Sequence, residues 1–374
     1  MTRLAAVIPA AGLSSRMGRF KPFLPLGDGT VLEQVINVFA PACIEPIIVV
    51  TGKRGDEVAA AAEKAGGVAV HNPDFEQGMF SSVLAGVKAL PDDIDGFFML
   101  PADVPLVRPE TVRGLAEAFG RERPAVLYPR FRGERGHPPV IRRDLLPDIL
   151  HHDGVGGLRA VLKRFEADSA DLDVADSGIL HDLDLPEDYD LAVTSFGRGY
   201  PDDAECAQLW AMADGTGHVM RHCEAVSRVA EALCAALNRR DGVKPLDRKL
   251  VRGAALTHDI GKGTRRHEEA GAELLHDHGF HAAAEIVRAH FDVELFPDEP
   301  ISEREVVFLA DKLVRCDHPV LLEGRYLEKM EMYADEPGAV PAIRGRLERA
   351  RNLLARFDRE MGVSSEQLAR EAFA

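Results

Sequence analysis

A change in hydrophobic periodicity near residue 200 divides the sequence into two halves that cannot share one fold class. Before it, short apolar runs rich in Val, Ile and Phe alternate with segments of helical period. After it, nearly every segment has apolar residues at helical spacing, and the turn-rich stretch Ser195–Ala204 lies between the halves. We therefore predict an α/β domain over residues 1–197, a linker over 198–204, an all-α domain over 205–336 and a helical extension over 337–374.

The first half predicts a mostly parallel sheet with helices on both faces, because strands and helices alternate along it. The expected strands are Leu4–Pro9, Ile47–Thr51, Val68–Val70, Phe97–Leu100 and Ala125–Tyr128. The expected helices are Val31–Phe39, Asp56–Ala65, Ser81–Leu90 and Pro109–Phe119. Sheets of this class bind ligands beyond the carboxyl ends of their strands, so we look for functional residues there.

In the second half we expect helices over His218–Leu237, Asp247–His258, His267–His276, Ala282–His290, Ser302–Val314 and Ala339–Phe357.

The net charge is −16, both halves are acidic and no basic block stands out, which argues against nucleic acid as a partner. No run of eighteen apolar residues exists, so we expect no membrane span. The five cysteines form no C-x-x-C, which predicts buried thiols in a reducing cytoplasm.

The loop after the first expected strand has the composition of a phosphate-binding turn. Residues 9–18 are rich in small side chains, which let backbone amides approach phosphate oxygens closely. Arg16 and Lys21 add positive charge. Neither a Walker loop nor a G-x-G-x-x-G fingerprint is present. Glycine-rich turns also follow strands that bind nothing, so the loop alone leaves both interpretations open.

Two carboxylates far apart in the sequence complete this candidate site. Asp103 follows the expected strand Phe97–Leu100, and Asp184 lies in the acidic segment Asp182–Asp188. Two separated carboxylates and the phosphates of a substrate form a typical Mg²⁺ site. For the second segment, a solvated acidic turn that caps a helix is the alternative.

Several segments resemble, in the same order, the motifs of the molybdenum cofactor nucleotidyltransferase family. They are Pro9–Gly27, Asn72–Ser82, Pro101–Pro105, Gly136–Pro139 and Asp184–Asp188, and the resemblance covers about residues 3–195. The first loop has Ala-Ala-Gly where the GTP-using branch usually has Ala-Gly-Gly, so it looks more like the CTP-using cytidylyltransferase branch. Use of GTP, or of another phosphorylated acceptor, remains the alternative. Pro101 and Ala102 depart from the glycine that more usually precedes the aspartate.

The resemblance implies a fold and a role for each matching residue. The fold is a Rossmann-like sheet of the nucleotide-diphospho-sugar transferase type. Asp103 and Asp184 would hold Mg²⁺, while Arg16, Lys21 and Asp103 would act in catalysis. The implied nucleotide-binding residues are Ala10, Ala11, Gly12, Ser14, Arg16, Lys21, Gly78, Ser81 and Ser82.

The implied reaction joins CTP to molybdopterin. A phosphate on the molybdopterin attacks the α-phosphorus of CTP, and pyrophosphate leaves. A molybdoenzyme that receives the cofactor is the implied protein partner. His137 is either a contact to the pterin or a structural histidine, and the sequence leaves these two interpretations open.

In the second half, polar residues lie on the apolar stripes of the expected helices. His222, His258, Asp259 and Asp311 all occupy such positions. A single buried histidine is usually a hydrogen-bonded core residue, but an unpaired buried carboxylate costs several kcal/mol. One metal ion bound by all four residues explains them together.

His267 and His290 also lie on inward-facing stripes and would ligate a second metal ion. The alternatives are a helix-capping residue for His267 and a core residue for His290. The order His222, then His258-Asp259-Ile260-Gly261-Lys262, then Asp311 is similar to the HD phosphohydrolase superfamily over about residues 205–335. This resemblance implies that metal-activated water attacks a phosphorylated small molecule, with Lys262 on its phosphate. The metal would be Mn, Fe, Co, Ni or Zn. A regulatory module that binds a nucleotide or metal without turnover is the alternative.

Overall fold

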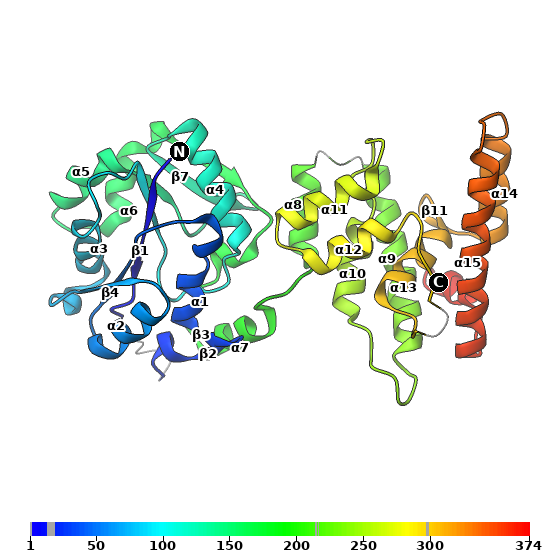
Figure 1. The fold of residues 1–374 in the computed structure, drawn as a ribbon, viewed down its shortest axis with the longest axis horizontal. Coiled ribbons are helices and arrows are strands. Elements are labelled where there is room, and N and C mark those ends of the chain that lie inside the picture. The colour runs from blue at the N-terminus through cyan, green and yellow to red at the C-terminus, as the bar shows by residue number, and fades with distance from the viewer. Residues whose placement is uncertain (1, 13–18, 214, 216, 297–298) are drawn as a thin grey trace. The chain divides into compact units, whose positions relative to one another are not determined.

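The computed structural model of the chain describes residues 2–12, 19–213, 215, 217–296 and 299–374. The chain forms two compact units, Met1–Gly197 and Arg198–Ala374 (Figure 1). The first unit combines a mostly parallel sheet with helices, and the second is largely helical. The fold classes predicted for the two halves are therefore confirmed.

An eight-stranded sheet forms the centre of the first unit, in the order β10-β7-β9-β6-β1-β4-β5, with β8 paired to β7. Its strands are β1 (Leu4–Pro9), β4 (Ile47–Thr51), β5 (Val68–His71), β6 (Gly96–Met99), β7 (Val126–Phe131), β8 (Glu134–Arg135), β9 (Val140–Arg142) and β10 (Ser169–Asp173). Strand β1 pairs in parallel with β4 and β6, whereas β9 is antiparallel to both β6 and β7. A separate hairpin joins β2 (Pro25–Leu26) to β3 (Gly29–Thr30).

Helices cover both faces of this sheet, which is why β1 is apolar along its whole length. Leu4, Ala6 and Ile8 belong to one core cluster, and Ala5 and Val7 belong to the cluster on the opposite face. The helices of the first unit are α1 (Val31–Asn37), α2 (Gly55–Lys64), α3 (Met79–Lys88), α4 (Pro109–Glu122), α5 (Leu146–Leu150), α6 (Gly157–Leu162) and α7 (Pro186–Ser195). Short 3₁₀ helices span Lys21–Phe23, Ala40–Ala42, Phe75–Gln77, Arg143–Leu145, Lys163–Asp168 and Ser177–Leu180.

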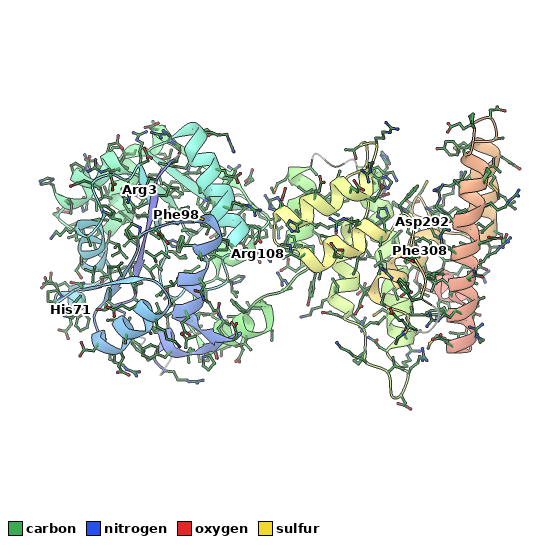
Figure 2. All side chains as sticks on the ribbon, in the orientation of Figure 1. Arg3, His71, Phe98, Arg108, Asp292 and Phe308 are labelled. Carbon is green, nitrogen blue, oxygen red and sulfur yellow. The ribbon has the colours of Figure 1, made fainter. Side chains whose placement is uncertain are left out.

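The second unit packs helices around a core that contains Phe308, as Figure 2 shows. Its helices are α8 (Asp203–Met212), α9 (Gly217–Leu237), α10 (Arg248–Thr257), α11 (His267–Asp277), α12 (His281–Ala289), α13 (Glu303–Lys312), α14 (Leu322–Met332), α15 (Ala339–Met361) and α16 (Ser365–Glu371). A short hairpin pairs β11 (Val314–Arg315) with β12 (His318–Pro319). Helix α9 packs against α10, α13 and α16, while α15 packs against α13 and α14. The residues after 337 thus belong to the compact second unit.

Helix α8 begins inside the segment that the sequence predicts as a linker. Asp202 and Glu205 form a reciprocal capping box at its start. Arg198 donates to the buried Glu205 carboxylate at 2.6 Å. The spacing of Asp202 and Glu205 is visible in the sequence, and it could have predicted where α8 begins.

Two of the thiols differ from expectation. Cys206, Cys223 and Cys234 are buried, but Cys43 and Cys316 are exposed, and all five are free. The prediction that all five pack in the interior is therefore wrong for Cys43 and Cys316, which lie in turns rather than on apolar helix faces. Of the helices that the structure describes, none has both the length and the apolar character that a membrane span requires.

A buried carboxylate holds the start of α4 against the loop after β10. Asp176 is only 2% exposed and accepts hydrogen bonds from Arg108 N at 2.8 Å, Thr111 Oγ1 at 2.7 Å and Gly178 N at 3.0 Å. Arg108 also forms an ion pair with it at 3.1 Å. The loop that carries Asp184 follows this anchor in the chain.

We predict that Asp176→Ala destabilises the first unit by about 3 kcal/mol, because it leaves buried donors and a cation without their partner. Asp144→Ala removes an exposed ion pair with Arg142 and should cost about 0.5 kcal/mol or less. Calorimetric unfolding of the full chain measures both changes. Equal effects of the two substitutions would contradict the structural role of Asp176.

Candidate active sites

The first candidate site lies beyond the carboxyl ends of β1 and β6. Ala102 N donates to the carbonyl oxygen of Pro9 at 3.1 Å, so the segments that follow the two strands stay side by side. Leu183 N donates to the carbonyl oxygen of Asp103 at 2.8 Å. This hydrogen bond brings Asp184, 81 positions later in the sequence, to the end of β6.

Lys21 lies between the two carboxylates that the sequence singled out. Its Nζ is 3.1 Å from Asp103 Oδ2 and 3.1 Å from Asp184 Oδ1. Burial alone would lower the pKa of Lys21, but attraction and hydrogen bonds from Asp103 and then Asp184 outweigh it and raise the pKa. The ammonium group therefore stays charged. Carboxylate oxygens that converge on one positive charge also fit a divalent metal ion.

A cavity of about 280 Å³ opens beside these residues. Of the predicted nucleotide-binding and metal-binding residues, it is lined by Ala10, Ala11, Gly12, Lys21, Gly78, Ser82 and Asp103. Phe75 and Glu76 also line it, although no role was predicted for either residue. The predicted residues Ser14 and Arg16 lie outside the described residues.

Ser81 supports the loop of this cavity rather than lining it. Its Oγ donates toward the carbonyl oxygen of Gly78 at 2.8 Å and accepts from Asn72 Nδ2 at 2.8 Å. Asn72 Nδ2 also donates to Ser82 Oγ at 3.0 Å, and the Asn72 side chain is buried. Gly78 has a φ of +101°, which favours glycine. Asn72 therefore positions the loop, although the sequence showed it only as part of a motif.

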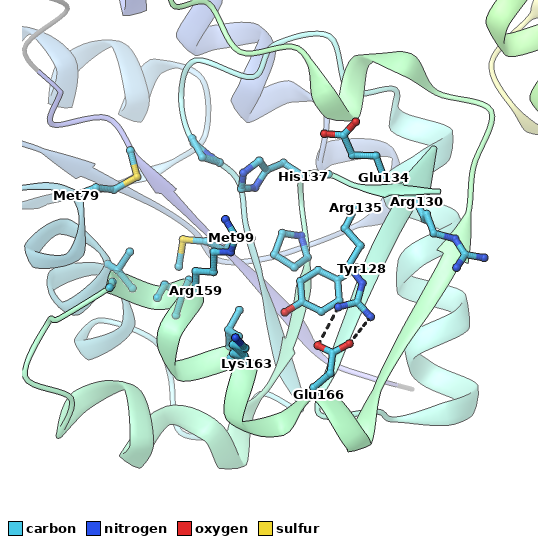
Figure 3. Close-up of a pocket in the computed structure, with 18 of the residues that line it drawn as sticks. Met79, Met99, Tyr128, Arg130, Glu134, Arg135, His137, Arg159, Lys163 and Glu166 are labelled. Atoms are coloured by element: carbon cyan, nitrogen blue, oxygen red, sulfur yellow. Dashed lines mark hydrogen bonds and ion pairs between the residues drawn. The ribbon is translucent and has the colours of Figure 1, made fainter. Parts of the chain in front are cut away.

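A larger cavity of about 1010 Å³ shares Pro9 and Met79 with the first one (Figure 3). Figure 3 shows Arg135 above the Tyr128 ring, 4.3 Å from its centroid, with Glu166 paired to the same guanidinium. Arg159 and Lys163 line this cavity as well, and neither forms an ion pair with a residue that the structure describes. The larger cavity thus offers an aromatic surface and positive charge beside the smaller cavity.

His137 also lines the larger cavity (Figure 3). Its Nδ1 is buried and has no hydrogen-bond partner among the described residues. Burial is the main reason that the pKa of His137 lies below its ordinary value. A histidine in the wall of a cavity can contact a ligand, so both interpretations of His137 remain compatible with its position.

The second candidate site lies inside the second unit, where its helices meet. His222 is on α9, His258 and Asp259 directly follow α10, and Asp311 is on α13. His267 begins α11, and His290 directly follows α12. The structure therefore brings all six predicted metal-binding residues together, and of these His258, Asp259, His290 and Asp311 are buried.

The six residues form two overlapping groups around Asp259. His222, His258 and Asp259 offer ligand atoms within 4.8 Å of one another, and so do Asp259, His267 and His290. The Nε2 atoms of His267 and His290 lie 3.3 and 3.5 Å from Asp259 Oδ1. On the other side, His222 Nε2 is 3.2 Å from Asp311 Oδ1. Asp259 is thus common to both groups, and these residues would hold the metal ions of such a centre.

The histidine side chains are held with Nε2 directed at the carboxylates. Nδ1 of His222, His258 and His290 contacts the carbonyl oxygens of Cys316, Ala255 and Val287 at 2.7, 2.8 and 2.6 Å. A carbonyl oxygen only accepts, so Nδ1 carries a proton, and Nε2 is the nitrogen left to ligate a metal.

His258 provides the most direct test of whether these residues fit a metal. Its Nε2 is buried and has no hydrogen-bond partner among the described residues. Burial is the main reason that the pKa of His258 falls to about 4. A neutral, buried imidazole whose lone pair has no donor is the form that ligates a metal.

Cations compensate the two buried carboxylates. Lys262 Nζ is 2.7 Å from Asp259 Oδ2, and Lys312 Nζ is 2.6 Å from Asp311 Oδ2. Burial raises the pKa of Asp311, but Lys312 and then Arg325 outweigh it and hold the pKa well below its ordinary value. Lys312 is itself buried and also donates to the His290 carbonyl oxygen at 3.0 Å. Sequence reasoning missed Lys312 and Arg325.

Gly261 permits the close packing that this site needs. A Cβ atom at Gly261 would lie 2.2 Å from the carbonyl oxygen of His267 and 2.6 Å from Gly271 N. Any other residue would push the first turn of α11 away from Asp259. The glycine of the His-Asp-x-Gly-Lys segment therefore sets the position of His267.

The fold and the two sites define an α/β nucleotidyltransferase-type domain followed by a helical domain with a histidine–aspartate centre. Residues 6–170 match the family profile described as MobA-like NTP transferase domain, and residues 219–316 match the HD domain. The chain therefore belongs to the MobA-like NTP transferase family and carries an HD domain after that domain.

Two relatives are each 30% identical to this chain and are matched over 95% of their own length. They are the molybdenum cofactor cytidylyltransferase of Escherichia coli and the purine catabolism protein PucB of Bacillus subtilis, and each match covers 50% of this chain. A solved nucleotidyl transferase from Methanothermobacter thermautotroptrophicus is 27% identical with a TM-score of 0.46, over 52% of this chain and 97% of that one.

We predict that His258→Ala weakens divalent metal binding by the full chain at least tenfold, which is roughly the smallest loss of affinity expected when a metal site is damaged. His276→Ala changes an exposed histidine of the same unit and should leave binding unchanged. Elemental analysis after dialysis against a metal buffer measures the bound metal. Retention of metal by the His258 variant, or equal loss in both, would contradict the proposed ligand set.

Proposed function

We propose that the first unit transfers CMP from CTP to the phosphate of the molybdenum cofactor and releases pyrophosphate. The observation that supports this most strongly is the position of Lys21, between Asp103 and Asp184 at a cavity that adjoins a larger one. The smaller cavity suits the nucleotide, and the larger one suits a bulky acceptor. The name of the Escherichia coli relative and the Ala10-Ala11-Gly12 loop favour CTP.

The reaction needs positioning and positive charge rather than a protein nucleophile. An oxygen of the acceptor phosphate forms a bond to the α-phosphorus while the bond to the leaving pyrophosphate breaks. Lys21 stabilises the negative charge that develops on the triphosphate, and we assign Arg16 the same task. Mg²⁺, held by Asp103 and Asp184, would supply further neutralisation of the phosphate oxygens.

The alternative function is transfer of a nucleotide to an acceptor other than molybdopterin, or transfer from GTP. The relative PucB is named for purine catabolism, so a likeness of this degree does not fix one acceptor or one nucleotide. Arg159 and Lys163 would favour any anionic acceptor in the larger cavity. GTP, or a different phosphorylated acceptor, is the competing reaction.

We predict that Asp103→Ala lowers the rate of pyrophosphate release at least about 100-fold, because one carboxylate of the cation site is lost. The assay uses Mg²⁺ and molybdenum-loaded molybdopterin and compares CTP with GTP. Glu117→Ala, an exposed change on α4, is the control and should retain full activity. Turnover with GTP alone would move the protein to the guanylyltransferase reaction. No turnover with either nucleotide would rule out this acceptor.

We propose that the second unit hydrolyses a phosphate ester. The supporting observation is the set of imidazoles whose Nε2 atoms face Asp259 and Asp311. Metal ions at this centre, of the Mn, Fe, Co, Ni or Zn class, would activate a water molecule and polarise the phosphate. Lys262 is at the mouth of the centre, with 52% of its side chain exposed, and is placed to bind the phosphate of the substrate.

A regulatory module that binds a metal or a nucleotide without turnover is the second candidate. It predicts the same metal content but no hydrolysis. The two candidates therefore differ in phosphate release, not in metal binding.

We predict that Asp259→Ala reduces phosphate release from p-nitrophenyl phosphate by the Mn²⁺-loaded full chain about 100-fold or more, because it removes the carboxylate shared by both groups. Asp277→Ala, an exposed change on α11, should leave the rate unchanged. Activity that survives in the Asp259 variant would point to a contaminating phosphatase. Absence of activity in a metal-loaded wild-type protein would favour the regulatory module.

A further inference from the structure

A cavity of about 320 Å³ opens beside the histidine–aspartate centre, with His222, Asp259 and Lys262 on one wall. Another part of its lining is one face of α14, because Arg325, Glu328, Lys329 and Met332 recur at helical spacing. The match to the HD domain ends at residue 316. The α14 wall is therefore contributed by a part of this chain outside that match.

Most of the charged groups of this cavity already have partners. Lys262 contacts Asp259 at 2.7 Å, Arg325 contacts Asp311 at 3.2 Å, and Arg315 is paired with Glu328. Lys329 differs, because its side chain forms neither an ion pair nor a hydrogen bond with any residue that the structure describes. Lys329 is exposed, so a ligand in the cavity can reach its ammonium group.

The lining of the cavity holds the cations Lys262, Arg315, Arg325 and Lys329 but only the carboxylates of Asp259 and Glu328, so the cavity favours an anion. An anion at Lys329 would supply the partner that no described residue provides. The scissile phosphate of the proposed reaction lies at the metals and Lys262, which is a different part of the cavity wall. The group at Lys329 is therefore a second negative charge on the same ligand.

Two further side chains of the lining, Met332 and Tyr333, offer apolar surface to a ligand. Met332 and Tyr333 are 68% and 38% exposed, and both line the cavity without being covered by other parts of the unit. A flat carbon skeleton packs well against a thioether and a phenol ring. A volume of about 320 Å³ admits a small molecule rather than a polymer.

We propose that Lys329 of α14 binds a second anionic group of the phosphate ester that is hydrolysed at the histidine–aspartate centre. The substrate class is a small phosphate monoester whose carbon skeleton carries a carboxylate or a second phosphate. Water forms a bond to phosphorus, the ester P–O bond breaks, and the alcohol oxygen of the leaving skeleton takes a proton. This proposal rests on the hydrolase function proposed for the second unit.

The test compares two substrates that differ by one negative charge. Phenyl phosphate has only its phosphate, whereas 3- and 4-carboxyphenyl phosphate add a carboxylate on the same ring. With the Mn²⁺-loaded full chain we expect kcat/KM to be about tenfold higher for at least one carboxylated isomer. Lys329→Gln should abolish this preference and leave phenyl phosphate within about twofold, as expected when only one charge contact is lost.

Two control variants separate this effect from damage to the fold. Lys249→Gln changes an exposed lysine at the start of α10 and should keep the preference. Lys329→Arg keeps the positive charge and should retain most of the preference. A preference that persists in Lys329→Gln, or a wild-type protein that prefers neither isomer, overturns the proposal.

A binding measurement distinguishes failure of this inference from failure of the hydrolase function. Phenylphosphonate and its 3- and 4-carboxy derivatives cannot be hydrolysed, and calorimetric titration of the metal-loaded full chain measures their affinity without turnover. Tighter binding of a carboxylated form that Lys329→Gln removes supports the anion site even if no ester is hydrolysed. Equal affinities in the wild type would contradict it.

Discussion

The burial of the Asp259 carboxylate determines the arrangement of the second unit. A carboxylate that is only 3% exposed is unfavourable unless positive charge or lone-pair acceptors such as a metal compensate it. Helices α9, α10, α11 and α12 each place a histidine at this group, and Lys262 supplies a cation. The carbonyl oxygens that fix the rings of His258 and His290 belong to the ends of α10 and α12. The packing of these helix ends therefore also positions the residues of the site.

In the first unit, two carboxylates also lie close together, beyond the carboxyl ends of β1 and β6. Asp103 and Asp184 come from loops far apart in the sequence, and Lys21 compensates both. Here the carboxylates are 28% and 42% exposed, so less of their charge needs a protein partner. A partly open pair suits a site that exchanges a nucleotide and a metal ion in each reaction cycle. A closed centre such as that at Asp259 suits metal ions that remain bound.

Much of this structure was predictable because its signals are local. The apolar runs of β1 and β4, the helical stripes of the second unit and the His258-Asp259 dipeptide are each visible within a few residues. Strands β9 and β10 were missed, since β9 has three residues and β10 contains two aspartates and no β-branched or aromatic side chain. Such strands depend on their neighbours in the sheet rather than on their own sequence.

The parts of the sites that the sequence did not reveal come from long-range packing. Asn72 reaches the serines of α3 through a turn, and Arg325 of α14 reaches Asp311 on α13. Nothing in a single sequence marks Lys329 as a cavity residue, because one lysine on an amphipathic helix is ordinary. Only the three-dimensional contacts show that its neighbours are paired and that it is not.

Anomalous diffraction from crystals of the full chain soaked in Mn²⁺ tests the two-metal centre most directly. We expect two peaks that share Asp259, one beside His222, His258 and Asp311 and the other beside His267 and His290. A single peak that leaves His267 and His290 without metal would contradict the second metal. A map without any peak, with Lys262 still in contact with Asp259, would contradict the metal centre itself.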